Sequence, residues 1–160
     1  MYYTIVVLFM FLLPTSSLLV ELFVFRSSLN VFLLVGKWFT FWGVGGRLLL
    51  AGLRQAIQPR FTAENILGIK SKGALQVVQE LGFGNISIGA IGILSILSGS
   101  WVMPAAIAGC MFYGFAGFRH VVKPGRNGLE NTALVSDLFI FAVLLLYIAF
   151  RVVSGPTAQA

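Results

Sequence analysis

Long apolar segments separated by short polar connectors run through the chain, and they constrain its fold more than any other feature. A helix needs about 20 mostly apolar residues to cross the hydrocarbon core of a bilayer. Five segments approach this length, so the sequence predicts an all-α integral membrane bundle of about five transmembrane helices. The five segments are residues 4–25, 30–57, 74–97, 101–121 and 131–152.

The composition supports a lipid environment. Of the 160 residues, 58% are hydrophobic and only 10% are charged, whereas soluble domains carry about 25% charged residues. A net charge of +6 raises the possibility of nucleic-acid binding. The cations lie in connectors between apolar segments, however, which is typical of membrane orientation signals. We therefore expect the lipid bilayer as a partner, and no nucleic acid.

The segments predict a simple domain organisation. Residues 1–28 form an N-terminal transmembrane helix, residues 29–153 a four-helix core, and residues 154–160 a tail. Residues 58–73 form a polar connector on the membrane surface. The first segment lacks a preceding Lys or Arg and a prompt small-residue cleavage site, so we interpret it as a mature helix rather than a signal peptide.

The second segment is the exception, because Lys37, Arg47 and Arg54 interrupt it. An interfacial helix is the alternative interpretation. Its residues 48–53 are apolar on all sides, which argues against a helix lying in the interface.

The distribution of cations predicts the orientation. If five segments alternate in direction, seven Lys and Arg residues lie on the side of the N-terminus and three on the other side. Cytoplasmic loops carry the excess of positive charge, so the N-terminus is expected in the cytoplasm. The three tryptophans then all fall toward the outer edge, where interfacial tryptophans are common.

Ionisable and amide side chains within the apolar segments need an explanation. A charged residue at a helix centre costs about 2.5–3.5 kcal/mol on insertion scales, so such residues face the protein interior and often mark function. Arg47 and Arg54 are two helical turns apart on one face. Similar depth predicts one buried polar cluster, in which the acids balance the arginines and the histidine. The predicted cluster is Arg47, Arg54, Glu80, Asn85, His120 and Asp137.

This cluster has two interpretations. It either holds the helices in register or forms a site for a ligand or proton. His120 is the single histidine, and a lone histidine without neighbouring ligands does not predict a metal site. The sequence predicts no cofactor.

Small residues form ridges on the third and fourth segments. Ala106, Cys110 and Gly114 recur at four-residue spacing, and residues 89–99 of the preceding segment are rich in glycine and serine. Such ridges let membrane helices approach closely. We therefore expect these two segments to pack against each other as an antiparallel hairpin.

Several short runs resemble a domain-of-unknown-function family of small bacterial multi-pass inner-membrane proteins. These runs are residues 36–39, 47–55, 58–64, 80–85, 130–131 and 136–137. The chain is more loosely similar to DoxX-like four-helix membrane proteins. The resemblance implies location in the bacterial inner membrane. It begins at Gly36, which implies that the first segment is an addition to a four-helix core, and it carries no catalytic mechanism.

Three functional hypotheses follow. The leading one is a non-enzymatic accessory or assembly protein with homo-oligomer or membrane-complex partners. The second is a binder or carrier of a small lipophilic or anionic molecule. The third is a membrane oxidoreductase-associated or lipid-modifying enzyme, although no nucleophile–base set, metal motif or phosphate loop supports it. A pocket open to lipid near Arg47 would favour the second hypothesis, and a sealed, fully paired cluster the first.

Overall fold

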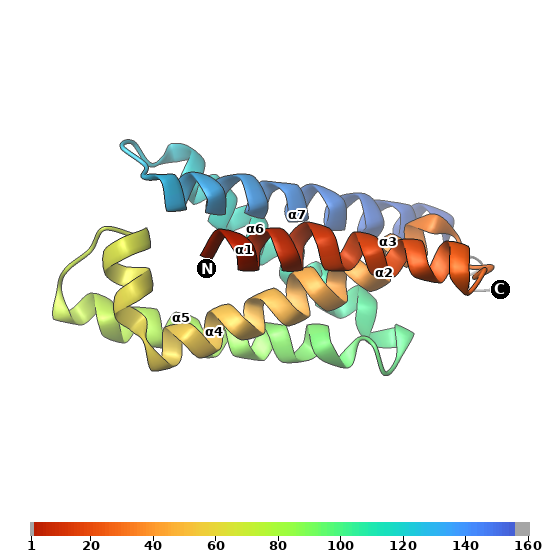
Figure 1. Cartoon of the computed structure of the whole chain (residues 1–160), viewed down its shortest axis with the longest axis horizontal. Helices are drawn as coiled ribbons and strands as arrows, with labels where there is room; N and C mark the ends of the chain where they lie inside the picture. Colours follow the sequence, from red (N-terminus) through yellow and green to blue (C-terminus); the bar gives the residue numbers. More distant parts are fainter. Residues whose placement is uncertain (1, 156–160) are drawn as a thin grey trace.

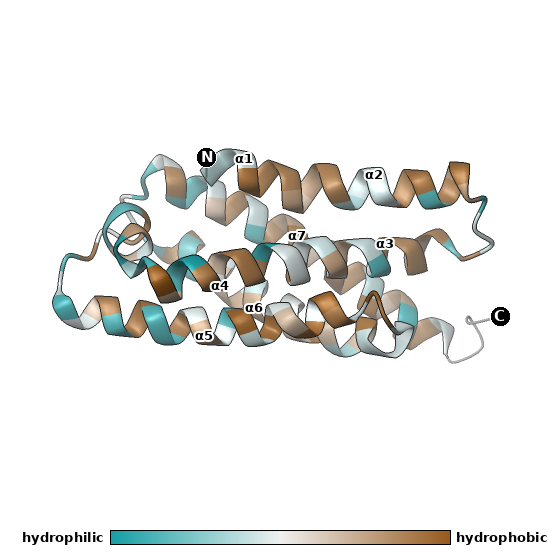
Figure 2. Cartoon of the chain, turned by 60° about the horizontal axis from the view of Figure 1, so that its bottom comes forward, coloured by the Kyte–Doolittle hydropathy of each residue, from teal (hydrophilic) through white to brown (hydrophobic). Residues whose placement is uncertain are grey.

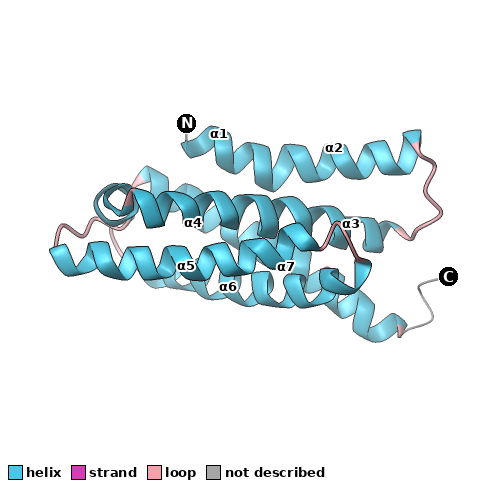
Figure 3. Cartoon of the chain, turned by 90° about the horizontal axis from the view of Figure 1, so that it is seen from below, coloured by secondary structure: helices cyan, strands magenta, loops and turns pink. Residues whose placement is uncertain are grey.

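The structure is a computed structural model that describes residues 2–155. Within this range every regular element is a helix (Figure 3). The predicted tail begins at the last residue of the last helix, Ser154, and residues 156–160 lie outside the described residues.

The first helix is continuous over Tyr2–Val24. It consists of α1 (Tyr2–Val7), η1 (Leu8–Leu12), α2 (Leu13–Leu19) and η2 (Val20–Val24), with π-helical winding in η1 and η2. Proline removes a backbone donor and clashes with the carbonyl of the preceding turn. The wider η1 turn ends at Leu12, two residues before Pro14, and this irregularity lets the helix continue past the proline.

The second helix is also continuous, over residues 31–57. It is built from α3 (Val31–Phe39), the π-helical η3 (Thr40–Gly46) and α4 (Arg47–Ile57). Asn30 caps its start by accepting a hydrogen bond from the Phe32 backbone N–H at 2.9 Å. The remaining elements are η4 (Phe61–Ile66), α5 (Lys72–Leu94), η5 (Gly99–Trp101), α6 (Val102–Val122) and α7 (Gly128–Ser154).

Four helices are long and apolar enough to cross a membrane: Tyr2–Val24, Lys72–Leu94, Gly99–Val122 and Gly128–Ser154. The predicted second span, residues 31–57, is a helix about 40 Å long at 1.5 Å per residue, which also exceeds a bilayer core. It differs from the other four because three cations lie along it.

Successive long helices alternate in direction (Figure 1). The connectors 58–71 and 123–127 lie at one end of the bundle, here called the connector end, and the N-terminus of the first helix faces this end. The connectors 25–30 and 95–98 lie at the opposite end. Hydrophobic residues dominate the first helix, and hydrophilic residues gather toward the connector end (Figure 2).

The helix pairing differs from the predicted hairpin. The glycines of α5 pack against the second helix: a Cβ at Gly92 would meet the Gly45 backbone, and one at Gly82 would lie 2.9 Å from the Gly52 carbonyl oxygen. The small residues of α6 instead face α7, where Gly114 meets the Phe141 ring. The expected α5–α6 packing along these ridges is therefore wrong, because each small face has another helix as its partner.

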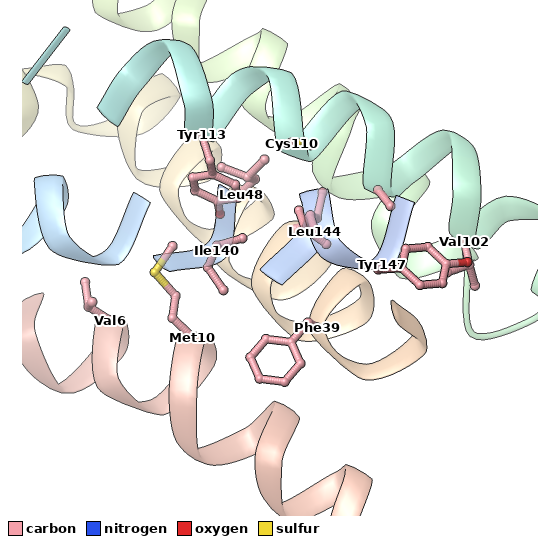
Figure 4. Packing of buried hydrophobic residues seen from close by; sticks show 12 residues of the cluster. Val6, Met10, Phe39, Leu48, Val102, Cys110, Tyr113, Ile140, Leu144 and Tyr147 are labelled. Atoms are coloured by element: carbon pink, nitrogen blue, oxygen red, sulfur yellow. The ribbon is translucent and has the colours of Figure 1, made fainter. Parts of the chain in front are cut away.

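The first helix is part of the core. Val6 and Met10 are buried and point toward Ile140 of α7 (Figure 4). At the opposite end, the Glu21 carboxylate accepts hydrogen bonds from Lys37 Nζ at 2.8 Å and from Trp38 Nε1 at 2.7 Å. The first helix is thus packed against α7 by apolar side chains and joined to the second helix by an ion pair.

Candidate functional site

A small pocket of about 70 Å³, here called the inner pocket, lies at the connector end. Its walls come from the first helix, α4 and η4, so three segments that are distant in the sequence enclose it. The lining residues are Tyr2, Ile5, Arg47, Leu50, Ala51, Arg54, Gln55, Phe61, Thr62 and Ile66.

Two arginines dominate the charge of the inner pocket. Arg47 and Arg54 share one face of α4, as their spacing predicted, and about 10 Å of helix rise separates them. The Arg47 guanidinium carbon lies 5.7 Å from the centre of the Tyr2 ring, and that of Arg54 lies 3.6 Å from the centre of the Phe61 ring. Aromatic faces attract cations, and these rings hold both guanidinium groups at the pocket.

The lining contains no acidic residue. Arg47 Nε is buried, and among the described residues 2–155 it has no hydrogen-bond acceptor. The rest of the Arg47 guanidinium interacts with the Tyr2 side chain and, electrostatically, with Asp137, which does not line the pocket. The inner pocket therefore has an excess of positive charge and an unused donor.

Asp137 on α7 is the acid associated with Arg47. The two side chains interact electrostatically, but they are not among the ion pairs within 4.0 Å formed by residues 2–155. Tyr113 of α6 is buried nearby, and its hydroxyl donates a hydrogen bond of 2.5 Å to the carbonyl oxygen of Gly43 in η3. Of the residues predicted to cluster by depth, Asp137 thus lies near Arg47 without pairing with it directly.

Asn85 reaches the inner pocket through one intermediary. Its Nδ2 donates a hydrogen bond of 2.7 Å to Oε1 of Gln55, a lining residue, and both side chains are buried. In the part of the chain that the structure describes, no donor contacts Asn85 Oδ1. Asn85 therefore acts on the pocket by orienting Gln55.

His120 lies in a different cluster. Its Nδ1 is 3.8 Å from Oε1 of Glu130, which is only 1% exposed and accepts a hydrogen bond of 2.6 Å from Lys123 Nζ. Glu130 also completes a capping box with Asn127 at the start of α7. The structure thus separates His120 from the arginines, and its acidic neighbour is Glu130.

Glu80 is exposed, and its carboxylate accepts a hydrogen bond of 3.2 Å from Gln76 on the same helix. The expected ion pair between Glu80 and an arginine is absent from residues 2–155. The reason is rotation of α5. Its glycine face packs on the second helix, and Glu80 projects from the other side, because positions 80 and 89 differ by about half a turn at 3.6 residues per turn.

Three hydrogen bonds fasten the η4 wall of the inner pocket to the connector between α6 and α7. Asn127 Nδ2 donates to the carbonyl oxygens of Asn65 at 3.1 Å and Ile66 at 3.2 Å. Lys123 Nζ donates to the carbonyl oxygen of Leu67 at 3.0 Å. We call these contacts the connector latch. They hold the segment that carries Phe61 and Thr62 against the bundle.

Besides the two arginines, the inner pocket has four aromatic or polar lining residues that sequence reasoning missed: Tyr2, Gln55, Phe61 and Thr62. Phe61 and Thr62 lie within the run 58–64 that carried the family resemblance, and Gln55 directly follows Arg54. Tyr2 was missed because the first helix was treated as an addition to the core. Within residues 2–155 no group of three or more His, Cys, Asp or Glu is placed to hold a metal ion.

The all-helical fold, with four helices that can cross a bilayer and a pocket at the bundle end, defines an integral membrane protein of the helical-bundle class. The chain belongs to a family of unknown function (DUF6790), whose profile matches residues 4–155. This match includes the first helix, so the expectation that this helix lies outside the family resemblance is wrong. Searches of the curated proteins and of the solved structures found no match.

Proposed function

We propose that this chain is a non-enzymatic membrane protein that binds or carries a small lipophilic anion in the inner pocket. One observation supports this most strongly: Arg47 and Arg54 line the pocket together, and no acidic residue lines it with them. The guanidinium groups of Arg47 and Arg54 would supply the donors for the ligand. The guanidinium group recognises carboxylate and phosphate through paired donors.

The rest of the lining favours an amphiphilic ligand. Ile5, Leu50 and Ile66 give the pocket apolar walls beside its arginines. Ligand sites are commonly apolar, with a few polar groups that fix orientation. A volume of about 70 Å³ accommodates a small anionic head group. Leu50 is 41% exposed, so an apolar tail can extend from the pocket into lipid.

The arginine pair favours binding over a purely structural cluster. A cluster that only held helices in register would satisfy its charges internally, because an unpaired buried charge is destabilising. Here Glu80 points away, and Asp137 is near Arg47 without pairing directly. We therefore favour the ligand hypothesis over an accessory or assembly role, which was the leading sequence-based interpretation.

We further propose five spans in a bacterial inner membrane, with the N-terminus in the cytoplasm. The support is the excess of Lys and Arg at the connector end and the length of the helix at 31–57. In this orientation the inner pocket lies at the cytoplasmic side.

Fusion reporters test this orientation. Alkaline phosphatase fused after residue 160 should be active, and a fluorescent protein fused there should be dark, because the last helix would end outside the cytoplasm. As a control, fusions after Arg126, in a connector on the opposite side of α7, should give the reverse pattern. The same pattern at both positions would contradict the proposed topology.

Ligand stabilisation tests the binding proposal, with decanoate as the probe because it combines one carboxylate with one chain. A ligand that binds only the folded state stabilises it by about 2.7 kcal/mol at a concentration of 100 Kd. Decanoate should raise the melting temperature of the purified protein in non-ionic detergent, and decyltrimethylammonium should not. Arg47→Gln and Arg54→Gln should abolish the shift.

Arg119→Gln is the matched control, since Arg119 is an exposed arginine of α6 outside the pocket. Equal decanoate shifts in wild type, Arg47→Gln and Arg54→Gln would rule out the inner pocket as the anion site.

A further inference from the structure

A second, larger pocket lies beside the inner pocket and faces outward at the connector end. Its volume is about 520 Å³. It shares Arg54 and Phe61 with the inner pocket, and it adds Arg60. The lining residues of this outer pocket are Arg54, Ile57, Gln58, Pro59, Arg60, Phe61, Asn65 and Leu75.

The outer pocket also has cations without counter-ions. Neither the Arg54 nor the Arg60 guanidinium group belongs to an ion pair in the part of the chain that the structure describes. The Arg54 guanidinium carbon lies 3.6 Å from the centre of the Phe61 ring, which places this cation at the wall that the two pockets share. Gln58 and Asn65 add amide groups. The chemistry of this lining suits an anion with several acceptor oxygens.

An apolar strip leads from the outer pocket toward the middle of the bundle. Leu50, Leu53 and Ile57 follow one another on α4 at spacings of three and four residues, so they lie along one side of the helix. All three are exposed, and Ile57, the residue that lines the pocket, is 74% exposed. Lipid is the expected environment for such side chains in a membrane-spanning bundle.

The geometry points to the outer pocket as a binding site for an acidic phospholipid. The phosphate group would lie between Arg54 and Arg60, the polar head would contact Gln58 and Asn65, and one acyl chain would follow Leu53 and Leu50. A zwitterionic lipid carries an ammonium group that these arginines do not favour. Acidic head groups are attracted to basic residues at the membrane surface, and such attraction is worth about 1 kcal/mol per Lys or Arg.

This site goes beyond the proposed anion-binding function, because different residues test the two pockets. Arg60 lines only the outer pocket and Arg47 only the inner one. Arg60 is exposed, so replacing it should not disturb folding. Arg119 again supplies a matched exposed arginine that lines neither pocket.

Native mass spectrometry of the full chain in detergent can measure lipid binding, with palmitoyl-oleoyl phosphatidylglycerol as the probe and palmitoyl-oleoyl phosphatidylcholine as the neutral comparison. Wild type should bind the first phosphatidylglycerol in clear preference to phosphatidylcholine. Arg60→Gln should weaken that binding roughly tenfold, the change expected for one lost charge-assisted hydrogen bond. Arg119→Gln and Arg47→Gln should bind phosphatidylglycerol like wild type.

Three results would overturn the proposal. Equal phosphatidylglycerol binding by wild type and Arg60→Gln would remove the outer pocket as the lipid site. Loss of binding in Arg47→Gln as large as in Arg60→Gln would show one site instead of two. Displacement of the lipid by equimolar inorganic phosphate would show a site for free anions. None of these results depends on the decanoate shift, so this proposal and the proposed function can fail separately.

Discussion

The second helix presents two faces that are built in opposite ways. Toward α5, Gly45 and Gly52 bring the backbones of two helices into contact. Toward the first helix and η4, Arg47 and Arg54 border an incompletely filled pocket. Close packing is rigid and transmits strain. The glycine face therefore fixes the helix in place, and this fixed helix positions two arginines in a pocket that no acidic residue lines.

We expect substitutions on the glycine face to lower the free energy of unfolding more than substitutions on the arginine face. Gly92→Ala would place a methyl group against the Gly45 backbone, which cannot move aside as a side chain can. We expect a loss of about 2–3 kcal/mol, as in overpacked cores, measured by denaturant unfolding in mixed micelles. Gly84→Ala is the matched control on the same helix, because nothing lies within 4 Å of its added carbon. Equal stability of the two variants would contradict the observed backbone contact.

Asn85→Ala tests the polar contact on the same interface. It removes the hydrogen bond of 2.7 Å to Gln55, and polar contacts between membrane helices average about 0.6 kcal/mol, up to about 1.7 kcal/mol. We expect a loss of about 1 kcal/mol in the same assay, together with weaker decanoate binding, since Gln55 lines the inner pocket. Gln76→Ala, at an exposed position of α5, should change neither the free energy of unfolding nor decanoate binding. If Gln76→Ala lowered both as much as Asn85→Ala does, Asn85 would have no specific role.

The arginine face should show the smallest stability effects. Arg54→Gln removes the contact with the Phe61 ring and should cost about 0.5–1 kcal/mol. Glu80→Gln, at an exposed site, should change stability by less than about 0.5 kcal/mol. Their double mutant should equal the sum of the single changes, because the structure contains no Arg54–Glu80 ion pair. A coupling above about 1 kcal/mol in this cycle would restore the pairing expected from the sequence.

Helix positions were predictable from the sequence, whereas helix partners were not. The segment predicted over 30–57 is a helix over 31–57, and the one predicted over 131–152 is α7, because apolar length and turn residues are local properties. A small-residue ridge indicates that another helix packs closely on that face. It does not indicate which helix packs there. The glycines of α5 meet Gly45 of the second helix rather than α6.

The same limit explains the candidate site. Arg47 and Arg54 share a face because both lie on one helix, where spacing fixes their relation. Glu80 and His120 were grouped with them by depth alone, and depth does not determine the rotation of a helix about its own axis. Tyr2 and Phe61 come from the first helix and from η4, so their place in the pocket depends on tertiary contacts that no local pattern specifies.

The connector latch also sets an order of events during synthesis. The wall of the inner pocket is made at residues 61–66, but the Asn127 side chain that holds this wall is translated 61 residues after Ile66. Chains emerge from the ribosome N-terminus first, so the first four long helices can enter the membrane while η4 is still unfastened. The pocket reaches its final form only when the connector before α7 arrives. Arg47 and Arg54 are therefore synthesised early, whereas the segment that closes the pocket around them is synthesised late.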